Sequence, residues 1–245
     1  MSATSGDDLL ATAVAAHGGP ARWREVREVT ARLRSGGLAL AARGRPRAFR
    51  AYEARILTAE PRVVIAPYPR PGLRGVFEAR AVRIETEAGA TLARREDPRA
   101  AFAGLRRALW WDPLDALHFA GYALWNYFTL PFLLLRDGFV LRELPAWEEA
   151  GERRRRLHVT FPPDVPTHSR EQVLHFDAAG LLRRHDYTAE VFGGWAHAAH
   201  YATGHRAFAG LVVPTRRRVY PRRRDGRARP FPTLVWIDVD DVRLA

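Results

Sequence analysis

Two hydrophobicity patterns divide this chain of 245 residues. Alternation of apolar and polar residues, as in VTARLR at 29–34, is typical of a strand with one buried face. Such segments recur between turns rich in Gly and Pro, and we expect strands at 29–34, 37–43, 48–58, 61–67, 72–78, 81–86 and 91–95, then at 139–144, 155–161, 170–177, 181–190, 196–204, 209–221 and 232–243. Many strands joined by short turns favour a barrel, a sandwich or a strongly curved antiparallel sheet.

Helical patterns occupy two other regions of the chain. Residues 6–16 and 20–26 predict short helices, and residues 98–108 and 113–130 predict a helical insert. We therefore expect one mainly β domain (α+β), a curved antiparallel sheet or incomplete β-barrel with helices over its concave face. Its expected parts are N-terminal helices at 1–26, a first antiparallel meander at 27–96, a helical insert or lid at 97–135 and a second meander at 136–245.

The insert contains the longest apolar run of the chain, residues 110–135. Its polar residues Asp115, His118, Tyr122 and Asn126 stand at i, i+3, i+7 and i+11, so a helix places them on one face. An apolar helix with one polar stripe must present that stripe to a cavity, a partner or water.

The start of this helix argues against a membrane span. Asp112 is a suitable N-cap and Pro113 a suitable first helical residue. The run is long enough to cross a bilayer, but Asp112 and Asp115 would each cost about 2.5–3.5 kcal/mol at bilayer depth. We expect no transmembrane segment, and a helix buried against the sheet.

A hairpin in the second meander predicts a wall for the polar stripe to face. In REQVLHF-DAAG-LLRRHDY, Gly180 suits a turn position with positive φ, and Phe176 is expected opposite Leu181. In that register one face carries Gln172, Leu174, Phe176, Arg183, His185 and Tyr187. Apolar surface with a few polar groups is typical of a ligand pocket.

The leading chemical hypothesis places the stripe and the wall on two sides of one cavity. Asp115 would orient and charge-stabilise His118, His118 or His185 would act as general acid or base, and Arg183 would bind an anion or oxyanion. The expected ligand-binding residues are Trp111, Tyr122, Trp125, Asn126, Gln172, Leu174, Phe176 and Tyr187. The ordinary alternative is that Asp115 stabilises the helix N-terminus and His118 is a structural histidine.

The large positive charge of the chain is weak evidence for a nucleic-acid partner. All 39 basic residues are arginine, and the formal net charge is +12. Clusters at 153–156, 216–218 and 222–224 are expected at solvated strand ends and hairpin tips, with an anionic surface as the alternative partner. No recognition helix, zinc-finger spacing or aromatic-basic RNA-binding pattern is present, so we expect no nucleic-acid partner.

Several chemistries are disfavoured by the sequence. The chain has no cysteine, which excludes disulfides and thiolate chemistry. His197 and His200 fall in an expected strand, where their side chains point to opposite faces, so we predict no metal site. Without a GxGxxG or Walker motif we predict no cofactor. Asp7 and Asp8 stand where a signal peptide would be basic, and we expect a cytoplasmic protein.

Three segments resemble the LolA/LolB-type lipoprotein-carrier fold: HGGPARWREV, LHFDAAGLLRRHDY and FAGLVVPTRRRVY. The resemblance implies an incompletely closed antiparallel barrel covered by helices, with a concave cavity for acyl chains or another apolar ligand. The chain departs from the carrier pattern because it shows no signal peptide or lipobox and has ionisable groups on the insert. Both departures favour a cytoplasmic protein that acts on a bound apolar molecule.

The sequence therefore predicts recognition of a hydrophobic or amphipathic small molecule, lipid-like in character, in the concave cavity. The leading version is cofactor-free acid–base chemistry on that molecule, such as isomerisation, cyclisation or dehydration. One alternative is a non-catalytic carrier of lipids or other hydrophobic ligands. A second alternative is an arginine-rich module that binds anionic surfaces.

Overall fold

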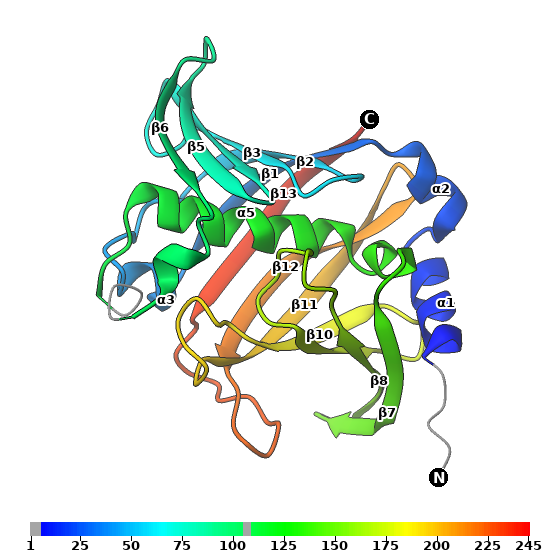
Figure 1. Ribbon diagram of the computed structural model, residues 1–245. Coiled ribbons are helices and arrows are strands. Elements are labelled where there is room, and N and C mark those ends of the chain that lie inside the picture. The colour runs from blue at the N-terminus through cyan, green and yellow to red at the C-terminus, as the bar shows by residue number, and fades with distance from the viewer. Residues whose placement is uncertain (1–5, 105–108) are drawn as a thin grey trace.

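The computed structural model describes residues 6–104 and 109–245 and arranges thirteen strands in one antiparallel sheet (Figure 1). The strands are β1 (Glu28–Gly36), β2 (Tyr52–Leu57), β3 (Val63–Ala66), β4 (Leu73–Glu78), β5 (Ala81–Thr86), β6 (Thr91–Glu96), β7 (Val140–Glu149), β8 (Glu152–Thr160), β9 (Glu171–Phe176), β10 (Leu182–Thr188), β11 (His197–Phe208), β12 (Leu211–Pro221) and β13 (Val235–Leu244). Their order is β6-β5-β4-β3-β2-β1-β13-β12-β11-β10-β9-β8-β7. The sheet curls around helix α5 (Pro113–Thr129) without closing, which confirms the predicted mainly β fold.

One non-local pairing joins the two meanders. β1 and β13 lie side by side, with Val29 opposite Leu244 and Arg34 opposite Asp238. Every other pair of neighbouring strands is consecutive in the chain. The first and last strands of the protein are therefore the centre of the sheet, and β6 and β7 are its edges.

The shorter helices lie at the ends and margins of the sheet (Figure 1). They are α1 (Asp7–Ala16), α2 (Gly19–Glu25), α3 (Leu38–Ala41) and the 3₁₀ turns η1 (Ala100–Phe102) and η2 (Phe132–Leu135). The strand predicted at 37–43 is wrong, because Gly37 takes a φ of +127° and the chain turns into α3. Of the helix predicted at 98–108, residues 105–108 lie outside the described residues, and the described part contains only η1.

Helix α5 fills the concave face of the sheet. Each of its residues after Pro113 is buried, and it packs mainly on β2–β6. Two glycines allow this close approach. A Cβ at Gly121 would overlap the Cβ and Cγ of Phe77 on β4, and a Cβ at Gly75 would lie 2.6 Å from the Leu117 side chain. Within the described residues, no helix has the length and apolar character needed to cross a membrane.

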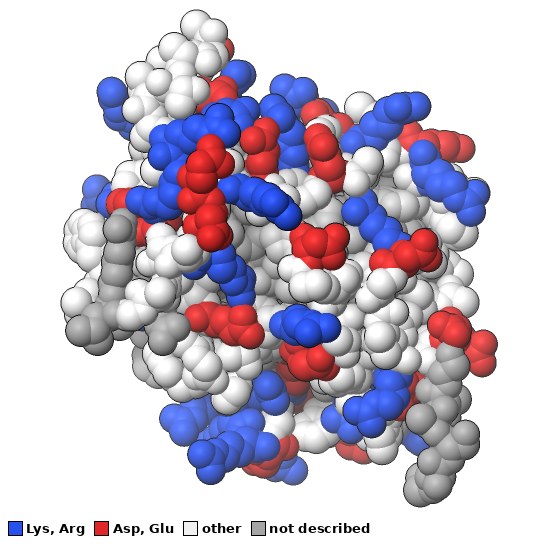
Figure 2. All heavy atoms as spheres, viewed as in Figure 1, with Lys and Arg blue, Asp and Glu red and all other residues white. Residues whose placement is uncertain are grey.

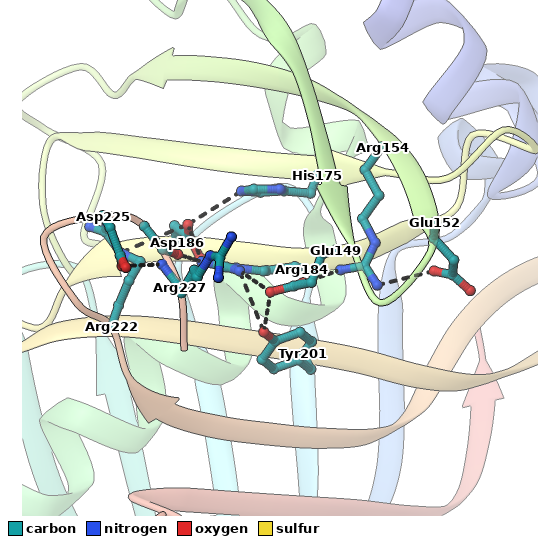
Figure 3. A network of polar contacts seen from close by, with 11 residues as sticks. Glu149, Glu152, Arg154, His175, Arg184, Asp186, Tyr201, Arg222, Asp225 and Arg227 are labelled. Carbon is teal, nitrogen blue, oxygen red and sulfur yellow. Dashed lines mark hydrogen bonds and ion pairs between the residues drawn. The ribbon is translucent and has the colours of Figure 1, made fainter. Parts of the chain in front are cut away.

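On the face of β10 that points away from α5, a buried ionic network holds two loops against the sheet (Figure 3). Arg184 is fully buried and donates to Asp186 at 2.7 Å and to Glu149 at 2.6 Å. It also donates to the carbonyl of Gly226, in the loop between β12 and β13. The network therefore fixes both this loop and the tip of the β7–β8 hairpin against the sheet.

Candidate ligand-binding site

The first turn of α5 is organised by a capping box. The side chain of Asp112 accepts from the amide of Asp115, and the side chain of Asp115 accepts from the amide of Asp112, both at 3.0 Å. Pro113 occupies the first turn, so the predicted start of the helix is confirmed. Arg95 of β6 donates to Asp115 at 2.5 Å and to Asp112 at 2.6 Å. These contacts assign Asp115 a role in fixing the helix to the sheet edge.

We expect Asp115→Ala to lower the free energy of unfolding by about 2 kcal/mol, because a cap and the buried carboxylate that pairs with the half-buried Arg95 are lost together. Urea unfolding at neutral pH measures the change. Glu96→Ala is the matched control, since Glu96 pairs with Arg94 in a largely exposed ion pair worth about 0–1 kcal/mol. Equal stability of the two variants would contradict this role of Asp115.

His118 lies at the base of an open cleft of about 840 Å³. The cleft is lined by Ala79, Arg80, Glu96, Asp97, Pro98, Arg99, His118, Pro162, Pro163, Asp164, Val165, Pro166, Thr167, Ser169, Arg170 and Glu190. Among the described residues neither ring nitrogen of His118 has a hydrogen-bond partner, and the Asp115 carboxylate accepts instead from Arg95 and from the amide of Asp112. Burial, then the charges of Arg99 and Arg95, lower the pKa of His118 to about 3.

A layer of buried polar side chains separates α5 from strands β9–β12. We call it the polar layer, and its members are Tyr122, Tyr127, His168, Gln172, His185, Tyr187, His200 and Arg217. The hydroxyl of Tyr127 lies 2.8 Å from Nε2 of His168 and 3.1 Å from the hydroxyl of Tyr187. Nδ1 of His168 lies 3.2 Å from the hydroxyl of Tyr122. His168 is thus held between two tyrosines of α5 and stacks on Tyr187.

A second hydrogen-bonded chain connects the end of the polar stripe to β10. Asn126 accepts from the Thr167 hydroxyl at 3.1 Å, and Gln172 donates to the same hydroxyl at 2.6 Å. The side-chain carbonyl oxygen of Gln172 contacts Nε2 of His185. Burial lowers the pKa of His185 to about 3, with Arg217 as the second cause. The predicted stripe and wall are therefore connected, but through tightly packed side chains.

The hairpin register differs from the predicted one. Phe176 lies opposite Leu182, an irregularity follows, and His185 then lies opposite Leu174. Relative to the predicted register, His185 and Tyr187 are displaced by two residues along β9. A displacement by two residues keeps a side chain on the same face of the sheet, so both still face α5, as Gln172 does. Arg183 does not join them, because it donates to Asp177 in the same hairpin at 2.7 Å.

Arg217 of β12 is a buried cation at the C-terminal turn of α5. It is 3% exposed, and within the part of the chain that the structure describes no carboxylate pairs with it. It donates to the carbonyl of Tyr127 at 2.7 Å, and its guanidinium carbon lies 4.8 Å from the Tyr127 ring centre. Desolvation lowers the pKa of Arg217 to about 10. A cation at a helix C-terminus is favoured by the helix dipole, which explains its position.

Sequence reasoning did not assign Tyr127, His168, His200 or Arg217 to the site. For Arg217 a signal was present, because alternation in a strand turns the middle residue of Arg216–Arg218 to the face opposite its two neighbours. His168 lies in the β8–β9 loop, where no periodicity applies. Of the predicted ligand-binding residues, Leu174, Phe176, Trp111 and Trp125 are buried in the apolar core.

Between α5 and the central strands lies an apolar void of about 30 Å³. It is lined by Ser35, Leu40, Phe49, Tyr52, Phe119, Ala120, Ala123, Leu124, Tyr127, Val235 and Ile237. None of the eight predicted ligand-binding residues borders this void. Ligand pockets of drug-sized molecules measure roughly 300–1,000 Å³, so in this conformation α5 occupies most of the hollow.

Comparison with known proteins identifies the architecture. No family model matches the sequence, and no curated protein matches it either. Among solved structures, a LolA superfamily protein from Nitrosomonas europaea is similar over 99% of this chain and 94% of its own, with a TM-score of 0.52 and 12% identity. The chain has a LolA-like fold.

Two further structures share the LolA-like fold with this chain. A DUF1329 family protein from Desulfovibrio piger matches with a TM-score of 0.56 and 13% identity over 98% of this chain and 94% of its own. A putative outer membrane lipoprotein-sorting protein domain from Vibrio parahaemolyticus matches with a TM-score of 0.52 and 9% identity over 97% and 91%. The predicted resemblance is thus confirmed for the fold.

Proposed function

We propose that the protein binds a hydrophobic or amphipathic small molecule, lipid-like in character, in the hollow between α5 and the curved sheet, and that it does so without chemistry. The observation that carries the proposal is a LolA-like sheet wrapped around a helix whose packing leaves an apolar void. One of the similar structures is named as a lipoprotein-sorting domain, and this name supports a lipid-like ligand.

The ligand would enter where α5 faces the central strands. Ala120 and Ala123 present only methyl groups to β1 and β13 at this point, so the helix surface is thinnest there. A shift of α5 away from these strands would enlarge the void. Tyr127 of the polar layer borders the void, and the members of the layer on β9–β12 would keep their contacts with one another. An apolar tail would then replace helix–sheet contacts at little hydrophobic cost.

The state of the buried histidines favours binding over catalysis. General acid–base groups work best when their pKa lies near the working pH. The pKa values of His118 and His185 are both lowered to about 3, with burial as the main cause. Both side chains are therefore neutral at neutral pH and are weak bases.

The test is binding of a fluorescent fatty acid, cis-parinaric acid, to the purified full-length protein, together with native mass spectrometry for a copurified ligand. We expect saturable binding, and Ala123→Leu to weaken it about tenfold, because the larger side chain fills the void that the tail must enter. Ala15→Leu is the matched control on the exposed face of α1. Absence of probe binding, or equal binding by both variants, would refute the proposal.

Acid–base catalysis on the bound molecule is the second candidate, and one observation favours it: an unpartnered His118 at the base of a large cleft. In that candidate His118 would act as general acid or base in a cytoplasmic enzyme. The predicted roles of Asp115, His185 and Arg183 would require a rearrangement, because Asp115 bonds Arg95 and Arg183 bonds Asp177. Replacing His118 and His185 with Ala would then abolish turnover of the identified ligand while the fold and ligand binding persist. Unchanged turnover would exclude it.

A further inference from the structure

We propose that one end of the molecule docks on an anionic lipid bilayer. The end in question is built from residues 37–50, 109–111, 192–196 and 221–232, which we call the rim. Five large apolar side chains of the rim are exposed to solvent: Leu38 (48%), Leu109 (70%), Trp110 (59%), Trp195 (74%) and Phe231 (81%). Exposed aromatic residues of this size are costly in water and are enriched at membrane–water interfaces.

The rim segments are distant in sequence but adjacent in space. The amide of Leu38 donates to the carbonyl of Thr233 at 3.3 Å, which joins α3 to the loop that precedes β13. Trp110 lies beneath the guanidinium of Arg45, whose carbon is 5.4 Å from the ring centre. Figure 1 shows α3 and the β12–β13 loop along the lower left of the molecule.

The 192–196 loop joins the same end through Phe192. The guanidinium carbon of Arg43 lies 5.3 Å from the centre of the Phe192 ring, and Trp111 packs on that ring at 4.7 Å. Trp195 lies two residues after Gly193, and its indole packs close to that glycine: a Cβ at Gly193 would lie 2.7 Å from the indole nitrogen of Trp195. The loop that carries Trp195 therefore adjoins the segments that carry Arg43 and Trp111.

Most of the protein's net charge is concentrated on this rim. Segments 37–50 and 221–232 contain nine arginines and one carboxylate, Asp225, whereas the rest of the chain has 30 arginines and 26 carboxylates. The exposed arginines are Arg47, Arg50, Arg223, Arg224, Arg227 and Arg229. Within the described residues, no carboxylate side chain forms an ion pair with any of these six. In Figure 2 basic side chains gather at the lower left, where Figure 1 places the β12–β13 loop.

The β12–β13 loop is held in place rather than left to move freely in solvent. Arg184 binds the carbonyl of Gly226, and Arg222 lies 3.8 Å from Asp186, so the buried network of Figure 3 fixes the base of the loop. The amide of Arg227 donates to Asp225 at 2.9 Å, which fixes the turn itself. The arginines next to Gly226 are thus carried by a turn that is fixed against the sheet.

An anionic bilayer matches this combination better than a nucleic acid does. Each arginine near an anionic membrane surface contributes about 1 kcal/mol, and aromatic side chains insert at the headgroup level. The rim also adjoins the proposed ligand site, because Leu40 of α3 and Phe49 line the apolar void. Docking on a bilayer would bring that void to a source of lipid-like molecules, but the docking itself requires no ligand in the hollow.

The experiment is cosedimentation of the full-length protein with vesicles of phosphatidylcholine, alone or mixed with phosphatidylglycerol. We expect binding to the mixed vesicles only, weakened by added NaCl. The triple variant Arg223→Gln, Arg224→Gln, Arg227→Gln is expected to bind on the order of 100-fold more weakly. Replacing Trp195 and Phe231 with Ser should weaken binding at least about tenfold.

Matched controls lie on exposed positions away from the rim. They are the triple variant Arg24→Gln, Arg142→Gln, Arg206→Gln, which removes the same charge, and Leu92→Ser on β6. Both should bind like the wild type, and thermal melts should show that all variants fold. Equal binding to neutral vesicles, equal loss in the control triple variant, or tighter rim-dependent binding to duplex DNA than to vesicles would overturn the proposal.

Discussion

Acidification below pH 6.5 is expected to destabilise this protein steeply, through four histidines that are buried in their neutral form. They are His118, His168, His185 and His200. Burial is the largest cause of each shift, lowering the pKa of His118 and His185 to about 3 and the pKa values of His168 and His200 well below the ordinary value of 6.5. The unfolded chain regains the ordinary value.

The sign of the effect follows from which state binds more protons. Above pH 6.5 both states carry neutral imidazoles and the stability is fully present. Between 6.5 and the folded-state pKa the unfolded chain binds the protons, so the free energy of unfolding falls by about 1.4 kcal/mol per pH unit for each histidine. Four such groups give about 5 kcal/mol per pH unit, which is comparable to the whole stability of a small protein.

His118→Phe is the sharpest test of this prediction. The ring of His118 packs between Phe77 and Phe102, and in the described structure it makes no hydrogen bond, so phenylalanine removes the titration without removing a bond. Urea unfolding measured from pH 7 to pH 5 should show a slope lower by about 1.4 kcal/mol per pH unit. His197→Gln is the control, because His197 is exposed. A slope equal to that of the control would show that His118 is not buried as a neutral base.

Local signals predicted much of the fold. The Asp112-Pro113 start of α5 and the turn at Gly180 are each determined by residues close in sequence, through capping and through positive φ. The pairing of β1 with β13 was not predictable, because it joins the two ends of the chain and has no local signature. Alternation also cannot reveal the irregularity after Leu182, so the hairpin register was missed although the faces were mostly right.

The site was less predictable than the fold, because helix periodicity gives a direction but not the neighbour in that direction. Tyr122 and Asn126 point toward the β8–β9 loop, which carries His168 and Thr167. Tyr127, one position beyond the predicted stripe, contacts the wall instead. A loop residue such as His168 enters the core only through tertiary packing, and no pattern in the sequence encodes that.

The close approach of α5 to β4 should make Gly121 intolerant of any side chain. We expect Gly121→Ala to lower the free energy of unfolding by about 2 kcal/mol. The added Cβ overlaps Phe77 at atoms next to its backbone, and overpacking of this kind costs about 1–3 kcal/mol. Alanine gains about 1 kcal/mol in helix propensity, so the net loss underestimates the steric cost. Urea unfolding at neutral pH measures it.

A graded series of glycine substitutions separates this contact from a general effect of alanine. Gly75→Ala should cost less, because it meets the flexible end of Leu117 and the edge of the Tyr68 ring rather than atoms next to a backbone. Gly194→Ala should cost almost nothing, because no atom lies within 4 Å. Any other order would contradict the close-packing argument. Since the overlap can be relieved only by moving α5 away from β4, Gly121→Ala should also loosen the helix that fills the hollow and increase probe binding relative to Gly194→Ala.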